Sequence, residues 1–144
     1  LYHPAVTREV YLNYMLKQIT QFLPSATRDR VRTICGQPAS FHKMSTLSSH
    51  EEEIMLEIWR SGAPVTGLAI RKALPDTAYD GSVVYTYLYR LEKKGYIRRL
   101  GSVRTSGYVP IISATDYVQN RIHRLAKVWT HGDLDMLLSY IPQN

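Results

Sequence analysis

Cysteine is nearly absent from this chain, with Cys35 the only one in 144 residues. A single thiol cannot form a disulfide within the chain, so we expect a fold held by its apolar core and a reducing, cytoplasmic setting. Long apolar runs are also missing, because no stretch approaches the roughly 20 residues that cross a bilayer. We therefore predict no membrane-spanning segment, and we find no secretory signal and no internal repeat.

The motifs of common enzyme classes are missing too. There is no glycine-rich phosphate loop, nucleophile elbow or zinc-protease motif. His131, Asp133 and Asp135 are metal-ligating residue types, but they fall at a helix break where Asp133 serves more simply as an N-cap. The adjacent residues 50–53 radiate around a helix and cannot converge on one ion. We predict that the protein is not an enzyme and has no cofactor or metal; a small hydrolase or metal enzyme built around His131 and Asp133 is one alternative.

Positive charge is in excess and is unevenly distributed. The chain carries 18 Lys and Arg against 12 Asp and Glu, a net charge of +6. Nine of these cations lie between Arg90 and Lys127, where Glu92 and Asp116 are the only acids. An early helical segment is acidic instead, with four glutamates between Glu51 and Glu57. The basic charge is therefore a patch, which favours a polyanionic partner: nucleic acid, a membrane surface or an acidic protein.

Apolar spacing, capping residues and glycine or proline breaks predict a mostly helical α+β chain. Residues 97–109 are predicted to be two short strands joined near Gly101, although Gly107 weakens the second strand. We divide the chain into a helical hairpin extension and linker (1–45), a DNA-binding domain (46–112) and a C-terminal helical part (113–144). The predicted helices span residues 6–23, 25–36, 49–60, 66–74 and 80–95, then run from the cap at Ser113 or Asp116 to Gly132 and from Asp133 to Ile141.

The helix predicted from Asp80 to Gly95 is the most informative segment. Asp80 is a suitable N-cap and Gly95 a suitable stop. Val84, Leu88 and Leu91 recur at helical spacing and predict a stripe that faces a core. The opposite face carries Ser82, Tyr85, Thr86 and Tyr89, which are able to hydrogen-bond to base edges or phosphates. A cationic ribbon follows, which is the order of a winged helix-turn-helix.

We therefore predict a site for double-stranded DNA on this helix and ribbon. The alternative is a winged-helix module that binds another protein, with DNA binding incidental, because three tyrosines within five residues also suit a protein interface. In that case the ribbon arginines are ordinary solvated charges. We expect Tyr87 to be packed at the edge of the core. The predicted DNA-binding residues are Ser82, Val83, Tyr85, Thr86, Tyr89, Arg90, Arg98, Arg99 and Arg104.

Residues 49–141 resemble the penicillinase and methicillin-resistance repressor family (BlaI/MecI type). The resemblance rests on Ser-His-Glu-Glu-Glu-Ile-Met-Leu-Glu-Ile-Trp at 49–59, on Leu-Pro-Asp-Thr at 74–77, on Val-Val-Tyr-Thr-Tyr-Leu-Tyr-Arg-Leu-Glu-Lys-Lys-Gly at 83–95, and on Tyr-Val-Pro at 108–110. It implies a homodimeric transcriptional repressor on a palindromic operator, with one recognition helix per subunit in the major groove. It further implies base-facing positions at Ser82, Val83, Tyr85 and Thr86, and a backbone-facing wing position at Arg104.

Two amphipathic segments follow the predicted winged domain. Their apolar stripes need cover, and burial against a second copy of the chain is the simplest solution. The resemblance implies the same arrangement, with the C-terminal helices forming the dimer. The predicted dimerisation residues are Val118, Ile122, Leu125, Trp129, Leu134, Leu137, Leu138 and Ile141.

The chain departs from the family pattern at several places. Val83 stands where the family usually has a threonine, and no Asn-Phe-like bond is evident near Arg124 and Leu125, where a sensor protease cuts some members. The helices predicted before Met44 have no counterpart in the family. Because Met44 and the residues after it are typical of the start of such a repressor, we interpret residues 1–43 as an added module or an upstream extension. Residues 1–45 are a candidate surface for a sensor or another partner protein.

Overall fold

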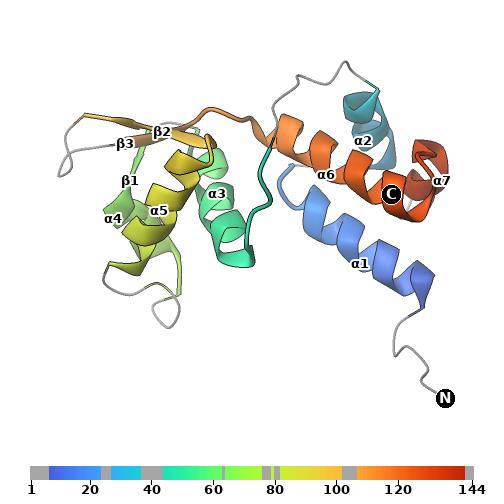
Figure 1. Cartoon of the computed structure of the whole chain (residues 1–144), viewed down its shortest axis with the longest axis horizontal. Helices are drawn as coiled ribbons and strands as arrows, with labels where there is room; N and C mark the ends of the chain where they lie inside the picture. The colour runs from blue at the N-terminus through green and yellow to red at the C-terminus, as the bar shows by residue number, and fades with distance from the viewer. Residues whose placement is uncertain are drawn as a thin grey trace. The chain divides into compact units, whose positions relative to one another are not determined.

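The computed structural model describes residues 7–23, 27–36, 44–62, 64–75, 79, 82–101 and 107–141. The chain forms two compact units: His42–Ser113, which we call the winged unit, and Leu1–Phe41 with Ala114–Asn144, which we call the terminal unit. The segments that we predicted as a separate extension and a separate C-terminal part therefore belong to one unit. Figure 1 labels the elements of both.

The winged unit contains three helices and a small antiparallel sheet. The helices are α3 (Ser49–Ser61), α4 (Gly67–Ala73) and α5 (Val83–Lys93). The sheet has the strand order β1-β3-β2, in which β2 (Ile97–Leu100) and β3 (Gly107–Pro110) form the predicted ribbon. The first strand, β1 (Val65–Thr66), was not predicted; it pairs with β3 through Val65 opposite Tyr108. A two-residue strand carries too little periodicity to be seen in a sequence.

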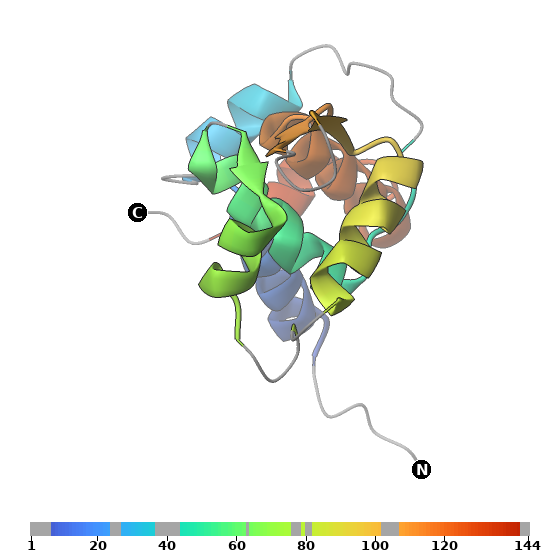
Figure 2. The ribbon, with the colours of Figure 1, turned by 90° about the vertical axis from the view of Figure 1, so that its left-hand side faces the viewer.

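The core of the winged unit lies between α3, α5 and the sheet. Figure 2 shows the elements of this unit from a second direction. The stripe predicted on α5 is confirmed, since Val84, Leu88 and Leu91 are fully buried. On α3, Ile54, Met55 and Ile58 are buried, while Trp59 is half-buried and donates its Nε1–H to the carbonyl of Ile112 at 2.9 Å. Each fully buried side chain of this size stabilises the fold by about 1.5–3 kcal/mol.

Capping residues and a glycine mark the ends of these helices. Thr66 caps α4 as predicted, with its hydroxyl accepting from the N–H of Ala69 at 3.1 Å. The capping box of α3 is formed by Ser48, which has the extended backbone that an N-cap needs, and Glu51. Gly95 ends α5 with a φ of 80°.

The terminal unit is made of α1 (Arg8–Thr20), α2 (Arg28–Cys35), α6 (Ala114–Trp129) and α7 (Leu134–Leu138). The helices α1 and α2 are shorter than predicted, since Thr7 and Thr27 are their N-caps; residue 25, where the second helix was predicted to begin, lies outside the described residues. On α1 the buried face is Leu12, Leu16 and Ile19, whereas Tyr11 and Met15 are half-buried. No described helix is long and apolar enough to cross a membrane.

Candidate nucleic-acid interface

The outer face of α5 is exposed, as its sequence pattern predicts. Tyr85 is 44% exposed and Tyr89 is 60% exposed, and Ser82, Thr86 and Arg90 are exposed beside them. Val83, another predicted contact, is half-buried. Because the other face of the same helix is fully buried, the position of these side chains is set by the core beneath them. The face presents hydroxyls, aromatic rings and a cation, which are groups that bind bases and phosphates.

The start of α5 differs from the prediction. Asp80, the predicted N-cap, lies outside the described residues, and the helix begins at Val83. Ser82 is the N-cap residue, but its backbone is already in the right-handed helical region and its side chain makes no capping hydrogen bond. The carbonyl of Ser82 accepts from both the N–H and the hydroxyl of Thr86, at 3.1 and 3.3 Å. Because the Ser82 hydroxyl caps no backbone N–H of the described helix, it is able to bind a ligand there.

Tyr85 has a second contact that fixes its orientation. Its ring lies against Gly67, the first residue of α4, so closely that a Cβ on that glycine would sit 2.5 Å from Cε1 of the tyrosine. Gly67 thus allows α4 and α5 to approach each other in the helix-turn-helix. The tip of the Tyr85 ring lies against α4 while the residue is 44% exposed, which gives the side chain a defined direction on the exposed face.

Tyr79 anchors the turn before α5 and was missed by the sequence analysis. It is 1% exposed, donates its hydroxyl to Glu53 Oε2 at 2.7 Å and lies 2.9 Å from Nδ1 of His50, both on α3. Burial, reinforced by the hydrogen bond and charge of Glu53, raises the pKa of the Tyr79 hydroxyl far above its usual value, so the group remains a donor. The ring of Tyr87 on α5 lies against both Tyr79 and His50. An aromatic residue just before the helix was the signal in the sequence.

Cations lie over two tyrosines of α5. The guanidinium of Arg90 is 5.5 Å from the ring centre of Tyr87, and the ammonium of Lys93 is 5.4 Å from that of Tyr89. Each pair is within the range of a cation–π contact. Lys93, which is not among the predicted DNA-binding residues, therefore lies beside the exposed face.

The ribbon presents its two described arginines on opposite sides. Arg98 and Arg99 are adjacent in β2, and side chains of a strand alternate between the faces of a sheet. Arg99 pairs with buried Tyr108 and shares its face, whereas Arg98 pairs with half-buried Val109 on the other face. Both arginines are exposed. Arg104, the third predicted cation of the wing, lies outside the described residues.

The weakness predicted for the second strand at Gly107 has a structural reason. A Cβ on Gly107 would lie 2.9 Å from Cβ of Pro64, so a larger residue would push apart β3 and the segment before β1. Glycine thus permits the close approach that lets β1 join the sheet. The strand forms despite the glycine because Gly107 pairs with both Thr66 and Leu100.

The residues of the metal alternative have structural roles. Asp133 caps α7, as predicted, by accepting from the N–H of Met136 at 3.0 Å. Asp135 lies 3.2 Å from Arg32. His131 has a φ of 53° at the break between α6 and α7. Within the described ranges, no three His, Cys, Asp or Glu side chains are placed to hold a metal ion.

The predicted dimerisation residues lie in the terminal unit, where α1 and α2 pack against α6 and α7. Six of them are buried in the single chain, and Trp129 and Leu134 are half-buried. The physical argument for a dimer, that these stripes lack cover within the chain, is therefore wrong. The dimer itself stays a prediction. The six buried residues are Val118, Ile122, Leu125, Leu137, Leu138 and Ile141.

The winged unit is a winged helix-turn-helix: α4 and α5 form the helix pair, and β2 and β3 form the ribbon that follows. A family model described as "Penicillinase repressor" matches residues 47–144. The chain therefore belongs to the penicillinase repressor family, whose members are DNA-binding transcriptional regulators and not enzymes. A protein named "Penicillinase repressor" from Bacillus licheniformis is 27% identical over 100 residues, which cover 69% of this chain and 78% of that relative. No solved structure matches significantly.

Proposed function

We propose that this protein represses transcription by binding, as a homodimer, to a two-fold symmetric DNA operator. The observation that carries the proposal is the exposed face of α5, which presents Tyr85, Thr86 and Tyr89 over a fully buried apolar stripe. Membership of the penicillinase repressor family supports it. One α5 from each subunit enters the major groove, and the bound dimer blocks access of polymerase to the promoter.

Base recognition and phosphate binding are assigned to different residues. Those on the first two turns of α5 read base edges, because a recognition helix contacts bases through its N-terminal part. The arginines bind phosphates, which set affinity and register but carry no sequence information. The base-reading set is Ser82, Val83, Tyr85, Thr86 and Tyr89, and the phosphate-binding set is Arg90, Arg98, Arg99 and Arg104.

The dimer is proposed to form through α6 and α7, using the eight apolar residues named above. A two-fold dimer places the same helix on two half-sites, so the operator repeats the symmetry of the protein. The half-sites are then separated by about one helical turn of DNA or a multiple of it.

The test is selection of genomic DNA fragments by the purified full chain, at a protein concentration at which it is dimeric and at about 150 mM salt, where nonspecific phosphate binding is weakened. We expect recovery of a dyad-symmetric motif. Binding without a shared motif would contradict sequence-specific repression. Failure to retain any fragment would favour the alternative in which the tyrosine face binds another protein.

Replacing Arg98 with alanine should weaken binding to all sequences by a similar factor. Loss of one phosphate contact should also reduce the slope of log affinity against log salt by about 1. Titrating operator and random DNA between 50 and 200 mM salt measures both effects. Arg60→Ala is the matched control, because Arg60 is exposed at the end of α3 and pairs locally with Glu57 at 3.5 Å. An unchanged slope in Arg98→Ala would remove Arg98 from the phosphate-binding set.

A further inference from the structure

The two N-terminal helices, α1 and α2, which we call the hairpin, both contact α6, and α2 also contacts α7. Leu12, Leu16 and Ile19 of α1, with Val31 and Ile34 of α2, are at most 8% exposed. They lie in the same unit as the buried residues of α6 and α7, and α6 contacts both hairpin helices. The family match begins at residue 47, after the hairpin. The cover over α6 and α7 is therefore formed by a part of the chain outside that match.

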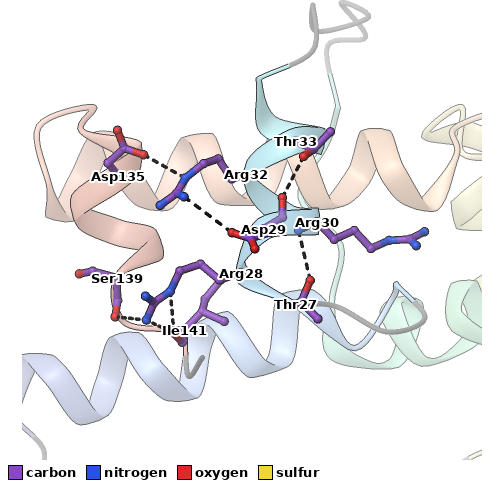
Figure 3. Close-up of polar contacts among 9 residues, drawn as sticks. All are labelled: Thr27, Arg28, Asp29, Arg30, Arg32, Thr33, Asp135, Ser139 and Ile141. Atoms are coloured by element: carbon purple, nitrogen blue, oxygen red, sulfur yellow. Dashed lines mark hydrogen bonds and ion pairs between the residues drawn. The ribbon is translucent and has the colours of Figure 1, made fainter. Parts of the chain in front are cut away.

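Polar contacts fix how the hairpin sits on α7. Figure 3 shows the Arg28 side chain reaching the end of α7, where it donates at 3.0 Å to the carbonyl of Ser139 and at 3.0 Å to that of Ile141. In the same view Arg32 pairs with Asp135 at 3.2 Å. Ser139 is the C-cap of α7 and Ile141 lies just beyond it, so neither carbonyl accepts a hydrogen bond from a later turn of that helix. Arg28 thus supplies partners that α7 does not provide itself.

Side chains of α6 also bind the end of α2, and a side chain of α1 binds the end of α6. The Nε2 group of Gln119, on α6, donates at 3.1 Å to the carbonyl of Ile34 at the end of α2, and Nε2 of His123 lies 3.3 Å from the carbonyl of Cys35. Arg8, on α1, donates to the carbonyl of Trp129 at the end of α6. The end of α2 is therefore bound by side chains of α6, and the ends of α6 and α7 by side chains of the hairpin. Apolar contact alone permits many packings, whereas these hydrogen bonds select one.

The first and last segments of the winged unit lie close together. This favours docking of the hairpin onto α6 and α7 of the same chain. Tyr96 is fully buried, and its hydroxyl donates to the carbonyl of Ser45 at 2.6 Å. Its own carbonyl accepts from the N–H of Ile111 at 2.8 Å and that of Ile112 at 3.4 Å. The segment that leads from the hairpin and the segment that leads into α6 thus both contact one residue.

We propose that the docked hairpin keeps the chain monomeric, by occupying the face of α6 and α7 through which a second copy would bind. This inference rests on the proposed function for the choice of dimer surface. Tethered segments reach effective concentrations of about 1 mM, so at about 1 μM protein the hairpin has roughly a thousandfold advantage over a second copy. Dimerisation, and with it tight binding to a palindromic operator, then requires release of the hairpin.

The single cysteine reports on hairpin docking. Cys35 is 5% exposed, and burial raises the pKa of its thiol to about 11. The docked thiol should therefore react slowly with a thiol reagent, and release of α2 should accelerate the reaction. Mass by analytical ultracentrifugation supplies the second measurement, on the full chain.

Leu16→Glu places a charge on the docked face of α1, where Leu16 is 2% exposed. We expect at least a tenfold faster reaction of Cys35 and a doubled mass at concentrations where the unmodified chain is monomeric. Tyr14→Glu is the matched control, since Tyr14 is 58% exposed on the same helix. It should change neither quantity. Arg28→Met, which removes only the contacts to α7, should give a smaller change in the same direction.

Two results would overturn the proposal. One is an unmodified chain that is dimeric at 1 μM with Cys35 protected. The other is a variant with reactive Cys35 that remains monomeric. If Leu16→Glu lost helical content by circular dichroism, Arg28→Met would decide. These measurements contain no DNA. If they support this proposal but the dimeric Leu16→Glu chain selects no dyad-symmetric motif, the result would contradict the proposed function alone.

Discussion

Replacing Lys94 with methionine should lower the free energy of unfolding by about 3 kcal/mol, because it leaves a buried carboxylate without its counter-ion. The ammonium of Lys94 lies 2.8 Å from Glu51 Oε1 and 2.9 Å from the carbonyl of Thr46. Glu51 is 2% exposed, and its second oxygen is buried with no hydrogen-bond partner among the described residues. The lysine is partly exposed, which places the effect at the lower end of the range for buried pairs.

The size of this effect should depend on pH. Burial raises the pKa of the Glu51 carboxyl, but the hydrogen bonds from Lys94 and Ser48 and the charge of Lys94 outweigh it and leave the pKa below its ordinary value. Stability from this group is therefore present above the unfolded pKa of about 4.3 and lost as pH falls through the folded pKa. Without Lys94, burial dominates and the carboxyl is protonated more easily. The deficit of the variant should thus be largest near neutral pH and shrink in acid.

Urea unfolding at a series of pH values measures this deficit. Lys93→Met is the matched control, because Lys93 is exposed one residue earlier on α5 and makes no ion pair with Glu51. The double variant Glu51→Gln with Lys94→Met should recover part of the lost stability, since no buried charge remains. A deficit that stayed constant between pH 7 and pH 3 would show that Lys94 acts through packing of its side chain and not through its charge.

Much of the winged unit could be predicted because its signals are local. The apolar stripe of α5 repeats within a few residues, and Thr66 caps α4 by accepting a hydrogen bond from the backbone N–H of Ala69, three residues later. Such patterns are independent of the rest of the fold. The exposed positions of α5 follow from the same stripe, since a helix that buries one face exposes the other.

Features that depend on distant residues could not be predicted. Tyr79 is held by a hydrogen bond to Glu53, which lies 26 residues away in the sequence. The helices that cover α6 are also distant from it in sequence: Gln119 of α6 bonds to Ile34 of α2, 85 residues away. From sequence alone, an apolar stripe on α6 indicates that something covers it, but not which segment. The sequence analysis predicted that a second copy of the chain covers this stripe. In the structure, the chain's own first two helices cover it.

A glutamate in place of Thr86 should reduce operator affinity by at least about a hundredfold, because a negative charge then faces the DNA from each subunit and like-charge contacts cost several kcal/mol. Thr86 is exposed, and among the described residues its hydroxyl bonds only to the carbonyl of Ser82, at 3.3 Å. It lies four residues into α5, where an acidic side chain is compatible with the helix dipole. The fold should therefore be at least as stable as before.

The experiment is decisive because Thr86→Glu is expected to lower operator affinity without lowering the stability of the fold. Fluorescence anisotropy with the selected operator measures affinity, and thermal unfolding measures stability in the same samples. Thr33→Glu, the same substitution at an exposed site on α2, controls for the change in net charge. If both variants lost affinity equally, the effect would come from overall charge. If Thr86→Glu bound like the unmodified chain, α5 would not be the recognition helix. Only a loss confined to Thr86→Glu, with stability kept, assigns sequence recognition to this face.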